Sequence, residues 1–222
     1  MSELDFWRQL DIFSPSQFKK AVHVIGVGAI GSYIAETLAK MGVKKIYVYD
    51  PDVVELHNLP NQVYGLKDEG KKKVEALASY LRETCGVEVK AADTEVGEGK
   101  YNFSGIIFLC VDSMAARKEI WDKYLKLNIN VDLLIEVRMG AEVGRIYTIK
   151  PFNYLDVKNY EKTLYSDEEA EESPCTARTI SSTVKVIAGI AAHKVTKFQR
   201  GIPYQKETIV SLNPLLITTR SW

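Results

Sequence analysis

The sequence predicts an α/β fold: a Rossmann-like, mostly parallel sheet with helices on both faces, followed by an antiparallel C-terminal extension. Two observations predict it. Apolar strand-like runs and amphipathic helix-like runs alternate through residues 21–137, which is the pattern of consecutive βαβ units. A glycine-rich turn at residues 26–31 directly follows the first apolar run, as it does where a nucleotide-binding sheet begins.

The expected elements follow from periodicity and from turn residues. We expect strands at 21–26, 45–50, 87–92, 105–111 and 130–137, and helices at 29–41, 69–84 and 114–127. The first helix repeats apolar residues at helical spacing and stops at Gly42. After Arg138 the pattern changes to an antiparallel strand at 142–149, a short helix at 157–165, a long helix at 178–199 and a last strand at 207–212.

Length and composition predict one domain. The chain has 222 residues, of which 46% are hydrophobic, enough to bury a sizeable core. We divide it into an N-terminal arm (1–20), a nucleotide-binding βαβ core (21–137) and an antiparallel extension (138–222). The acidic stretch Ser166–Ser173 is too polar for a core, and we expect a surface crossover loop at 166–177.

Charge and targeting signals narrow the function classes. Lys plus Arg and Asp plus Glu number 29 each, so no global charge predicts binding to nucleic acid or to an anionic membrane. No window of about 18 apolar residues predicts a membrane span, and the first residues lack a signal-peptide pattern. We therefore expect a cytoplasmic protein. Three cysteines and three histidines without paired spacing predict reduced thiols and no structural zinc.

The glycine-rich turn has the residue types that a phosphate needs. Gly26 permits the tight turn, Gly28 lets backbone amides approach a phosphate, and Gly31 lets the helix pack close to the sheet. Ala29 and Ile30 complete the turn, where the unpaired amides and the helix dipole favour an anion. Asp50 follows the next strand, 19 positions after Gly31, and can accept hydrogen bonds from a ribose diol.

The residues beyond this turn favour ATP over NAD. Asp52, Asn58 and Gln62 lie in a polar loop that an ordinary NAD-binding domain does not need. Lys73 and Asp112 are ambiguous by themselves. The lysine stands in a run of three lysines, which is often a solvated face, and the aspartate can simply cap the helix that follows it.

Several spaced motifs together resemble the ThiF-type adenylating enzymes, the family that includes molybdopterin-synthase-activating and ubiquitin-activating enzymes. The resemblance covers most of the chain. Its marks, in order, are Arg8-Gln9, the glycine turn, Asp50, Asp52, Asn58, Gln62, Asp68-x-Gly70-x-x-Lys73, and Asp112 after the strand at 105–111 with Arg117 five residues on.

The resemblance implies adenylation of a C-terminal carboxylate. The substrate would be a small ubiquitin-like or sulfur-carrier protein, or a peptide, and the cofactors ATP and Mg²⁺. Charge builds on the phosphates as pyrophosphate leaves, so fixed cations must stabilise it. In this family pattern Lys73 and Arg8 are those cations, Asp112 holds the magnesium ion, and Asn58 and Gln62 orient the phosphates and the carboxylate. Arg8 would act on the partner subunit's ATP, which implies a homodimer.

Cys175 is the candidate nucleophile for a second step. It lies between Ser173-Pro174 and the expected helix at 178–199, close to Arg178, and both a helix N-terminus and a cation lower a thiol pKa. Its place resembles that of the family cysteine that takes over the acyl group as a thioester. The alternative is an ordinary loop cysteine. Cys85 and Cys110 are expected in the core.

One departure from the family pattern leaves two alternatives open. Asn61 stands immediately before Gln62, where the family has an arginine, and losing one charged phosphate contact costs ~3 kcal/mol of transition-state stabilisation. Arg138 or Arg178 can replace that cation, or the chain is a catalytically weak nucleotide-binding scaffold. An NAD-dependent oxidoreductase is the other alternative, and it leaves the loop and Asp112 unexplained.

Overall fold

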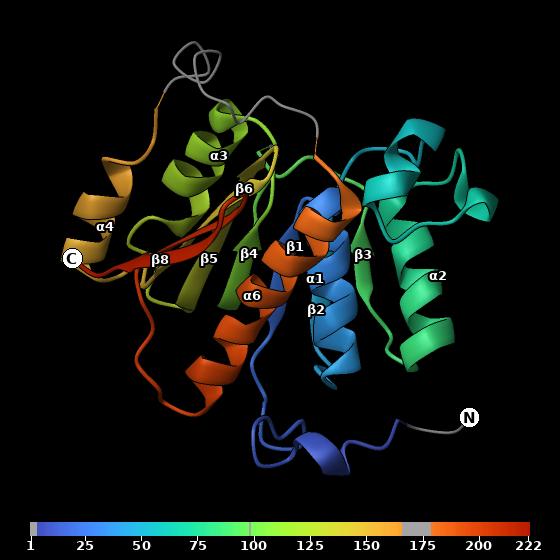
Figure 1. The fold of residues 1–222 in the computed structure, drawn as a ribbon, viewed down its shortest axis with the longest axis horizontal. Helices are drawn as coiled ribbons and strands as arrows, with labels where there is room; N and C mark the ends of the chain where they lie inside the picture. The colour runs from blue at the N-terminus through green and yellow to red at the C-terminus, as the bar shows by residue number, and fades with distance from the viewer. Residues whose placement is uncertain (1–3, 98, 166–178) are drawn as a thin grey trace.

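The computed structural model describes residues 4–97, 99–165 and 179–222. In this part of the chain a single sheet has eight strands in the order β3-β2-β1-β4-β5-β6-β7-β8 (Figure 1). The first five strands pair in parallel, and β6, β7 and β8 pair antiparallel. The predicted fold class is therefore confirmed. The strands are β1 (Val22–Ile25), β2 (Ile46–Tyr49), β3 (Lys90–Ala92), β4 (Gly105–Leu109), β5 (Val131–Gly140), β6 (Val143–Ile149), β7 (Glu207–Leu212) and β8 (Leu215–Arg220).

Helices cover both faces of the sheet. On one face α1 (Ala29–Lys40) stands beside α2 (Lys73–Cys85) and α6 (Ser181–Gln199) (Figure 1). The other face is covered by α3 (Met114–Ile120), the π-helical turn η4 (Trp121–Leu125) and α4 (Tyr154–Glu161). Two hydrophobic clusters result, one on each face. Every residue of β1 and β4 is buried, as expected for parallel strands covered on both sides.

Several observed boundaries in the parallel half differ from the expected ones, among them those of α2 and β5. Helix α2 begins at Lys73 and not at residue 69, because the residues before it form the 3-10 turn η3 (Leu66–Asp68) and a β-bridge between Val53 and Lys72. Strand β5 continues to Gly140 and does not end at residue 137. The crossover loop predicted at 166–177 lies outside the described residues.

The expected last strand, β7, is not the last one. An additional strand, β8, pairs with β7 through the turn at Asn213 and Pro214. All six residues of β8 are exposed, so the strand has no buried face and no alternation of apolar and polar positions that would have predicted it.

The N-terminal arm lies at the end of the sheet opposite the carboxyl ends of the parallel strands. Its 3-10 turn η1 (Trp7–Gln9) is tied to the C-terminal end of α1, where Gln9 Nε2 donates a hydrogen bond to the Met41 carbonyl at 2.7 Å. Figure 1 shows the arm below the sheet, at the far end of α1 from the loops above.

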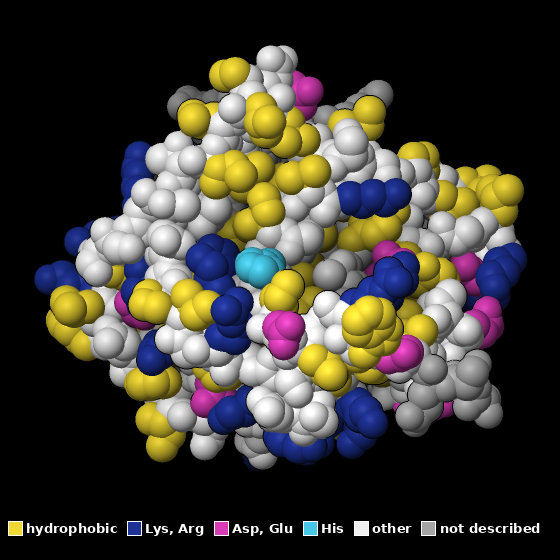
Figure 2. All heavy atoms as spheres, turned by 60° about the horizontal axis from the view of Figure 1, so that its bottom comes forward, with side chains coloured by type: hydrophobic (Ala, Val, Ile, Leu, Met, Phe, Trp, Pro, Cys, Tyr) yellow, Lys and Arg dark blue, Asp and Glu magenta, His cyan; other side chains and the backbone are white. Residues whose placement is uncertain are grey.

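Charged side chains of both signs are dispersed over the end of the molecule that carries the arm (Figure 2). A cavity of about 510 Å³ lies there at the amino ends of the central strands, and its lining includes Lys19, Lys20, Lys44, Lys45 and Lys90. Among the residues that the structure describes, each helix is too short or too polar to cross a lipid bilayer.

Candidate active site

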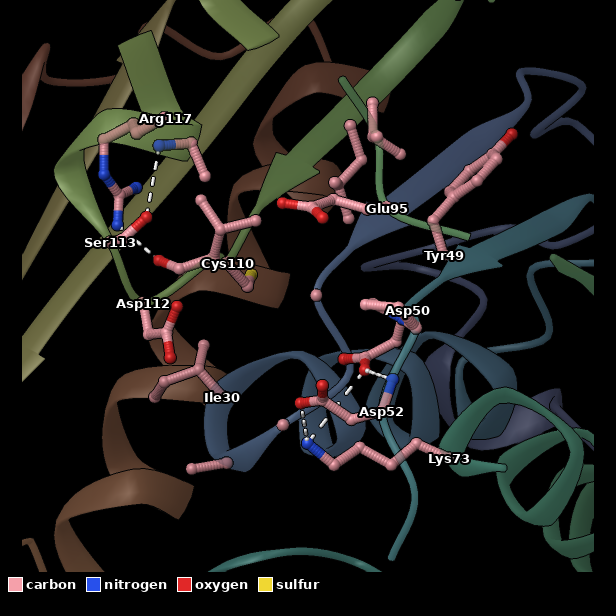
Figure 3. Close-up of a pocket in the computed structure, with 18 of the residues that line it drawn as sticks. Ile30, Tyr49, Asp50, Asp52, Lys73, Glu95, Cys110, Asp112, Ser113 and Arg117 are labelled. Carbon is pink, nitrogen blue, oxygen red and sulfur yellow. Dashed lines mark hydrogen bonds and ion pairs between the residues drawn. The ribbon is translucent and has the colours of Figure 1, made fainter. Parts of the chain in front are cut away.

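A cavity of about 850 Å³ lies at the carboxyl ends of the parallel strands, above the N-terminus of α1 (Figure 3). The strand order reverses here, because the chain leaves β1 for β2 on one side and returns to β4 on the other. Ligands of open α/β sheets bind at such a switch point. The described lining includes Gly26, Gly28, Ala29, Ile30, Asp50, Asp52, Asn58, Gln62, Lys73, Glu95, Asp112, Arg117 and Arg138.

The glycine turn forms the floor of this cavity. Gly26 has φ +84°, and a Cβ there would lie 2.8 Å from the Cys110 carbonyl oxygen. A Cβ on Gly31 would lie 1.8 Å from the Gly26 carbonyl oxygen, so only glycine allows α1 to start this close to the strand. Helix α1 begins after Gly28 without a side-chain cap. Its first-turn amides are therefore available to an anion.

Asp50 is fixed at the end of β2 by backbone donors. Its Oδ2 accepts the Val27 N–H at 2.8 Å, and its Oδ1 accepts the Asp52 N–H at 3.0 Å. Burial raises the pKa of this carboxyl, although Lys73 and the two backbone donors act in the opposite direction. The carboxylate is thus held in one orientation, with lone pairs left for a hydroxyl donor.

Lys73, the first residue of α2, is buried and does not lie on a solvated face. Its Nζ lies 2.6 Å from Asp52 Oδ2 and 4.0 Å from Asp50 Oδ1. Figure 3 shows the lysine pointing toward these two carboxylates at one side of the cavity. The half-exposed Lys71 instead pairs with the buried Asp68.

The polar loop after β2 contributes through the 3-10 turn η2 (Leu56–Asn61). Asn58 and Gln62 line the cavity, and the buried Gln62 Oε1 has no hydrogen-bond partner in the described part of the chain. Asn61 does not line the cavity: its Nδ2 donates to the Thr179 carbonyl at 3.0 Å. Asn61, which stands where the resemblance implies an arginine, therefore links η2 to the residues just before α6.

Asp112 follows β4 at the opposite side of the cavity from Lys73 (Figure 3). The cap of α3 is Ser113 and not Asp112, since Ser113 Oγ accepts the Ala116 N–H at 3.1 Å. The exposed Asp112 carboxylate has no hydrogen bond or ion pair to the residues that the structure describes. The helix-cap interpretation of Asp112 was wrong.

Sequence reasoning missed the buried ion-pair cluster beside this cavity. Glu136 on β5 is fully buried, and its carboxylate accepts hydrogen bonds from Arg117 Nη1 at 2.5 Å and from Arg138 Nη2 at 2.8 Å. Arg138 Nη1 also donates to the Thr163 carbonyl at 2.6 Å. Since its donors are engaged in this way, Arg138 is held in place within the protein and does not present a free phosphate clamp. A glutamate inside the apolar run at 131–137 was the available signal.

Of the remaining predicted residues, Arg8 does not line the cavity. Arg8 is exposed on the N-terminal arm, with its guanidinium 5.2 Å from the centre of the Trp7 ring. The 12 residues of α1 separate it from the glycine turn, a distance of roughly 18 Å. Cys175 and Arg178 lie outside the described residues.

Comparison with known proteins identifies the family. A model of the ThiF family matches residues 13–221. The chain belongs to the ThiF family. Ubiquitin-like modifier-activating enzyme 5 of Drosophila ananassae is 31% identical over 149 residues, which are 60% of this chain and 37% of that protein. The Xenopus laevis protein of the same name is 28% identical over 204 residues, 80% of this chain and 50% of that protein. This ThiF-family chain thus spans half or less of the length of these two relatives.

Solved structures share the fold of this ThiF-family chain. A crystal structure of E. coli MccB with ATP aligns with a TM-score of 0.72 at 20% identity, covering 93% of this chain and 66% of that one. A structure of PaaA aligns with a TM-score of 0.70 at 21% identity, covering 93% and 74%. The family predicted from the spaced motifs is confirmed.

Proposed function

We propose that this chain adenylates the C-terminal carboxylate of a small ubiquitin-like or sulfur-carrier protein, or of a peptide. The observation that carries the proposal is the cavity that Asp50, Lys73 and Asp112 line above an uncapped helix N-terminus, in a chain of the ThiF family. The named relatives activate ubiquitin-like modifiers, and MccB has been crystallised with ATP and with MccA.

The residues divide the work of binding ATP. The backbone N–H groups of Gly28–Gly31 donate hydrogen bonds to phosphate oxygens, and the Asp50 carboxylate accepts hydrogen bonds from the ribose hydroxyls. Lys73 supplies a positive charge beside the phosphates, and Asp52 positions its ammonium group through an ion pair of 2.6 Å. Asn58 and Gln62 donate amide N–H groups to the phosphates and the incoming carboxylate. The buried Gln62 Oε1 has no partner among the described residues and can accept a hydrogen bond from a hydroxyl or a water molecule.

A magnesium ion fits this donor set. The described residues contain no cluster of three or more metal-ligating side chains, and Mg²⁺ usually binds to one or two carboxylates together with substrate phosphates and water. Asp112 is a cavity-lining carboxylate without a protein partner among the described residues. It would hold the ion, which neutralises charge on the phosphates when bound.

The carboxylate oxygen of the substrate attacks the α-phosphorus, the bond to the bridging oxygen breaks, and pyrophosphate leaves with its electron pair. A second transfer to Cys175 would release AMP and form a thioester. Arg8 lies at the far end of α1 in its own chain, so its proposed phosphate contact requires a second copy, which favours a homodimer.

Pyrophosphate exchange tests the proposal. The chain is incubated with ATP, MgCl₂, labelled pyrophosphate and the small-protein and peptide fraction of a lysate of its source. Label should enter ATP in the wild type and not in Asp112→Ala. Cys175→Ala should keep the exchange but lose any adduct that dithiothreitol releases. Failure to bind ATP in a thermal-shift titration, or stronger stabilisation by NAD at equal concentration, would overturn the proposal.

A further inference from the structure

The position of Asp50 determines where a nucleobase must lie. In an extended nucleotide the base and the phosphates project from opposite sides of the ribose, and the phosphates occupy the α1 N-terminus. The base therefore points away from α1, toward the neighbouring strand β3. The Asp50 N–H donates to the carbonyl of Ala92, the last residue of β3. The loop at residues 93–97 thus lies directly beside the ribose position.

This loop offers one ionisable side chain to the cavity. Thr94, Glu95 and Val96 line the cavity, whereas Asp93 does not and pairs with Lys72 at 3.2 Å. The Thr94 hydroxyl is already engaged with the Tyr101 hydroxyl at 3.0 Å. The Glu95 carboxylate is exposed and has neither a hydrogen bond nor an ion pair within the described ranges. Figure 3 shows it extending into the cavity on the side away from Lys73.

Apolar side chains from β1, from the loop after β3 and from α3 also line the cavity. Ile25, Val96 and Ile120 are buried hydrophobic residues of the cavity lining. Burial raises the pKa of the Cys110 thiol to about 12, so this side chain stays neutral at physiological pH. Apolar side chains of this kind can pack against the faces of a planar base. The Glu95 carboxylate can then distinguish one base from another by the donors and acceptors on the edge of its ring.

We infer that Glu95 is the specificity-determining residue for the nucleobase: its carboxylate accepts a hydrogen bond from the exocyclic amino group of adenine. A carboxylate has only acceptor atoms when ionised. It attracts the 6-amino group of ATP and repels the 6-oxygen of inosine or guanosine triphosphate, because two acceptors then face each other. The inference deepens the proposed function and rests on its ATP-binding part.

The experiment compares ATP with ITP, which differ at position 6 of the base. Apparent dissociation constants are measured by thermal-shift titration with MgCl₂ for the wild type, Glu95→Gln and Asp93→Asn. The wild type should prefer ATP by about tenfold or more, the discrimination expected from one hydrogen bond to a charged acceptor. Glu95→Gln should lose most of this preference, since an amide can accept from one base or donate to the other.

Asp93→Asn is the matched control, because it removes a carboxylate from the same loop that does not line the cavity. Its preference for ATP should equal that of the wild type. Equal affinity of the wild type for ATP and ITP, or an unchanged preference in Glu95→Gln, would overturn the inference. Pyrophosphate exchange is measured separately. Exchange without base discrimination would support the proposed function and reject the inference about Glu95. Base discrimination without exchange would support the inference and reject the proposed function.

Discussion

Two clusters of carboxylates and cations lie beside the same cavity, and they are built differently. In the Lys73 cluster, Asp50 and Asp52 surround one buried ammonium, and the Asp52 side chain is 63% exposed. In the Glu136 cluster, one carboxylate with 0% exposure is enclosed by Arg117 and Arg138, which are 3% and 7% exposed.

The difference in charge compensation favours the Lys73 cluster as the candidate ligand site. Burial raises the pKa of Asp50 because Lys73 and the backbone donors only partly offset it. Burial acts the same way on Glu136, but the two arginines overcome it and lower the pKa of that carboxyl. The two arginines compensate the charge of Glu136 without a ligand, although Arg117 Nε has no hydrogen-bond partner among the described residues. The Lys73 cluster retains an exposed carboxylate and an incompletely compensated one, which suits a site that exchanges partners when ATP binds.

The largest effect is expected from breaking the Glu136 cluster. Glu136→Gln leaves two buried guanidinium groups without their counter-charge, and removing one partner of a buried pair costs about 3 to 5 kcal/mol. Urea denaturation measures the loss. Asp132→Asn is the control on the same strand, since Asp132 pairs with Lys20 at the surface and such pairs contribute about 1 kcal/mol or less. Equal effects of the two variants would contradict a structural role for the Glu136 cluster.

Breaking the Lys73 cluster should impair turnover more than stability. Lys73→Ala removes the cation beside the phosphates, and losing one such group lowers the rate by about 10²- to 10³-fold. Lys73 pairs at 2.6 Å with Asp52, which is 63% exposed, and only at 4.0 Å with the buried Asp50. We therefore expect a smaller loss of unfolding free energy than in Glu136→Gln. Pyrophosphate exchange and urea denaturation are measured together. The control is Lys71→Ala, which removes a half-exposed lysine outside the cavity lining and should retain pyrophosphate exchange. If Lys73→Ala also retains exchange, Lys73 is not the cation beside the phosphates.

The sequence predicted the Lys73 side of the cavity better than the Glu136 side. Gly26, Gly31 and Asp50 belong to one contiguous βαβ unit, where local spacing determines the geometry. Glu136 and Arg117 are brought together by strand pairing and helix packing between separate elements, which no short motif encodes. The same limit explains the missed strand β8 and the hydrogen bond that connects Asn61 to Thr179.

Asn61 should behave as part of neither cluster. Asn61→Ala removes its hydrogen bond to the Thr179 carbonyl and should cost about 1 kcal/mol of unfolding free energy. Because Asn61 does not line the cavity, the apparent affinity for ATP should change little. Asn58→Ala is the matched comparison: Asn58 lines the cavity and contacts Glu55 only at 3.5 Å, so ATP affinity should fall with little change in stability. The reverse pattern would assign Asn61 to the nucleotide site.

The smallest effect is a difference in pH dependence, and it tests the comparison directly. The pKa of Glu136 is lowered from 4.5, so the stability it contributes is present above pH 4.5 and is lost as the pH falls through the folded-state pKa. The pKa of Asp50 is raised from 3.8, so the unfolded chain ionises first and unfolding free energy falls as the pH rises from 3.8 to the folded-state value. Asp50→Asn should therefore make the rise of stability with pH steeper over that window, whereas Glu136→Gln should flatten it. Urea denaturation at a series of acidic pH values measures both slopes. Slopes that change in the same direction in the two variants would mean that the clusters do not differ in electrostatic compensation.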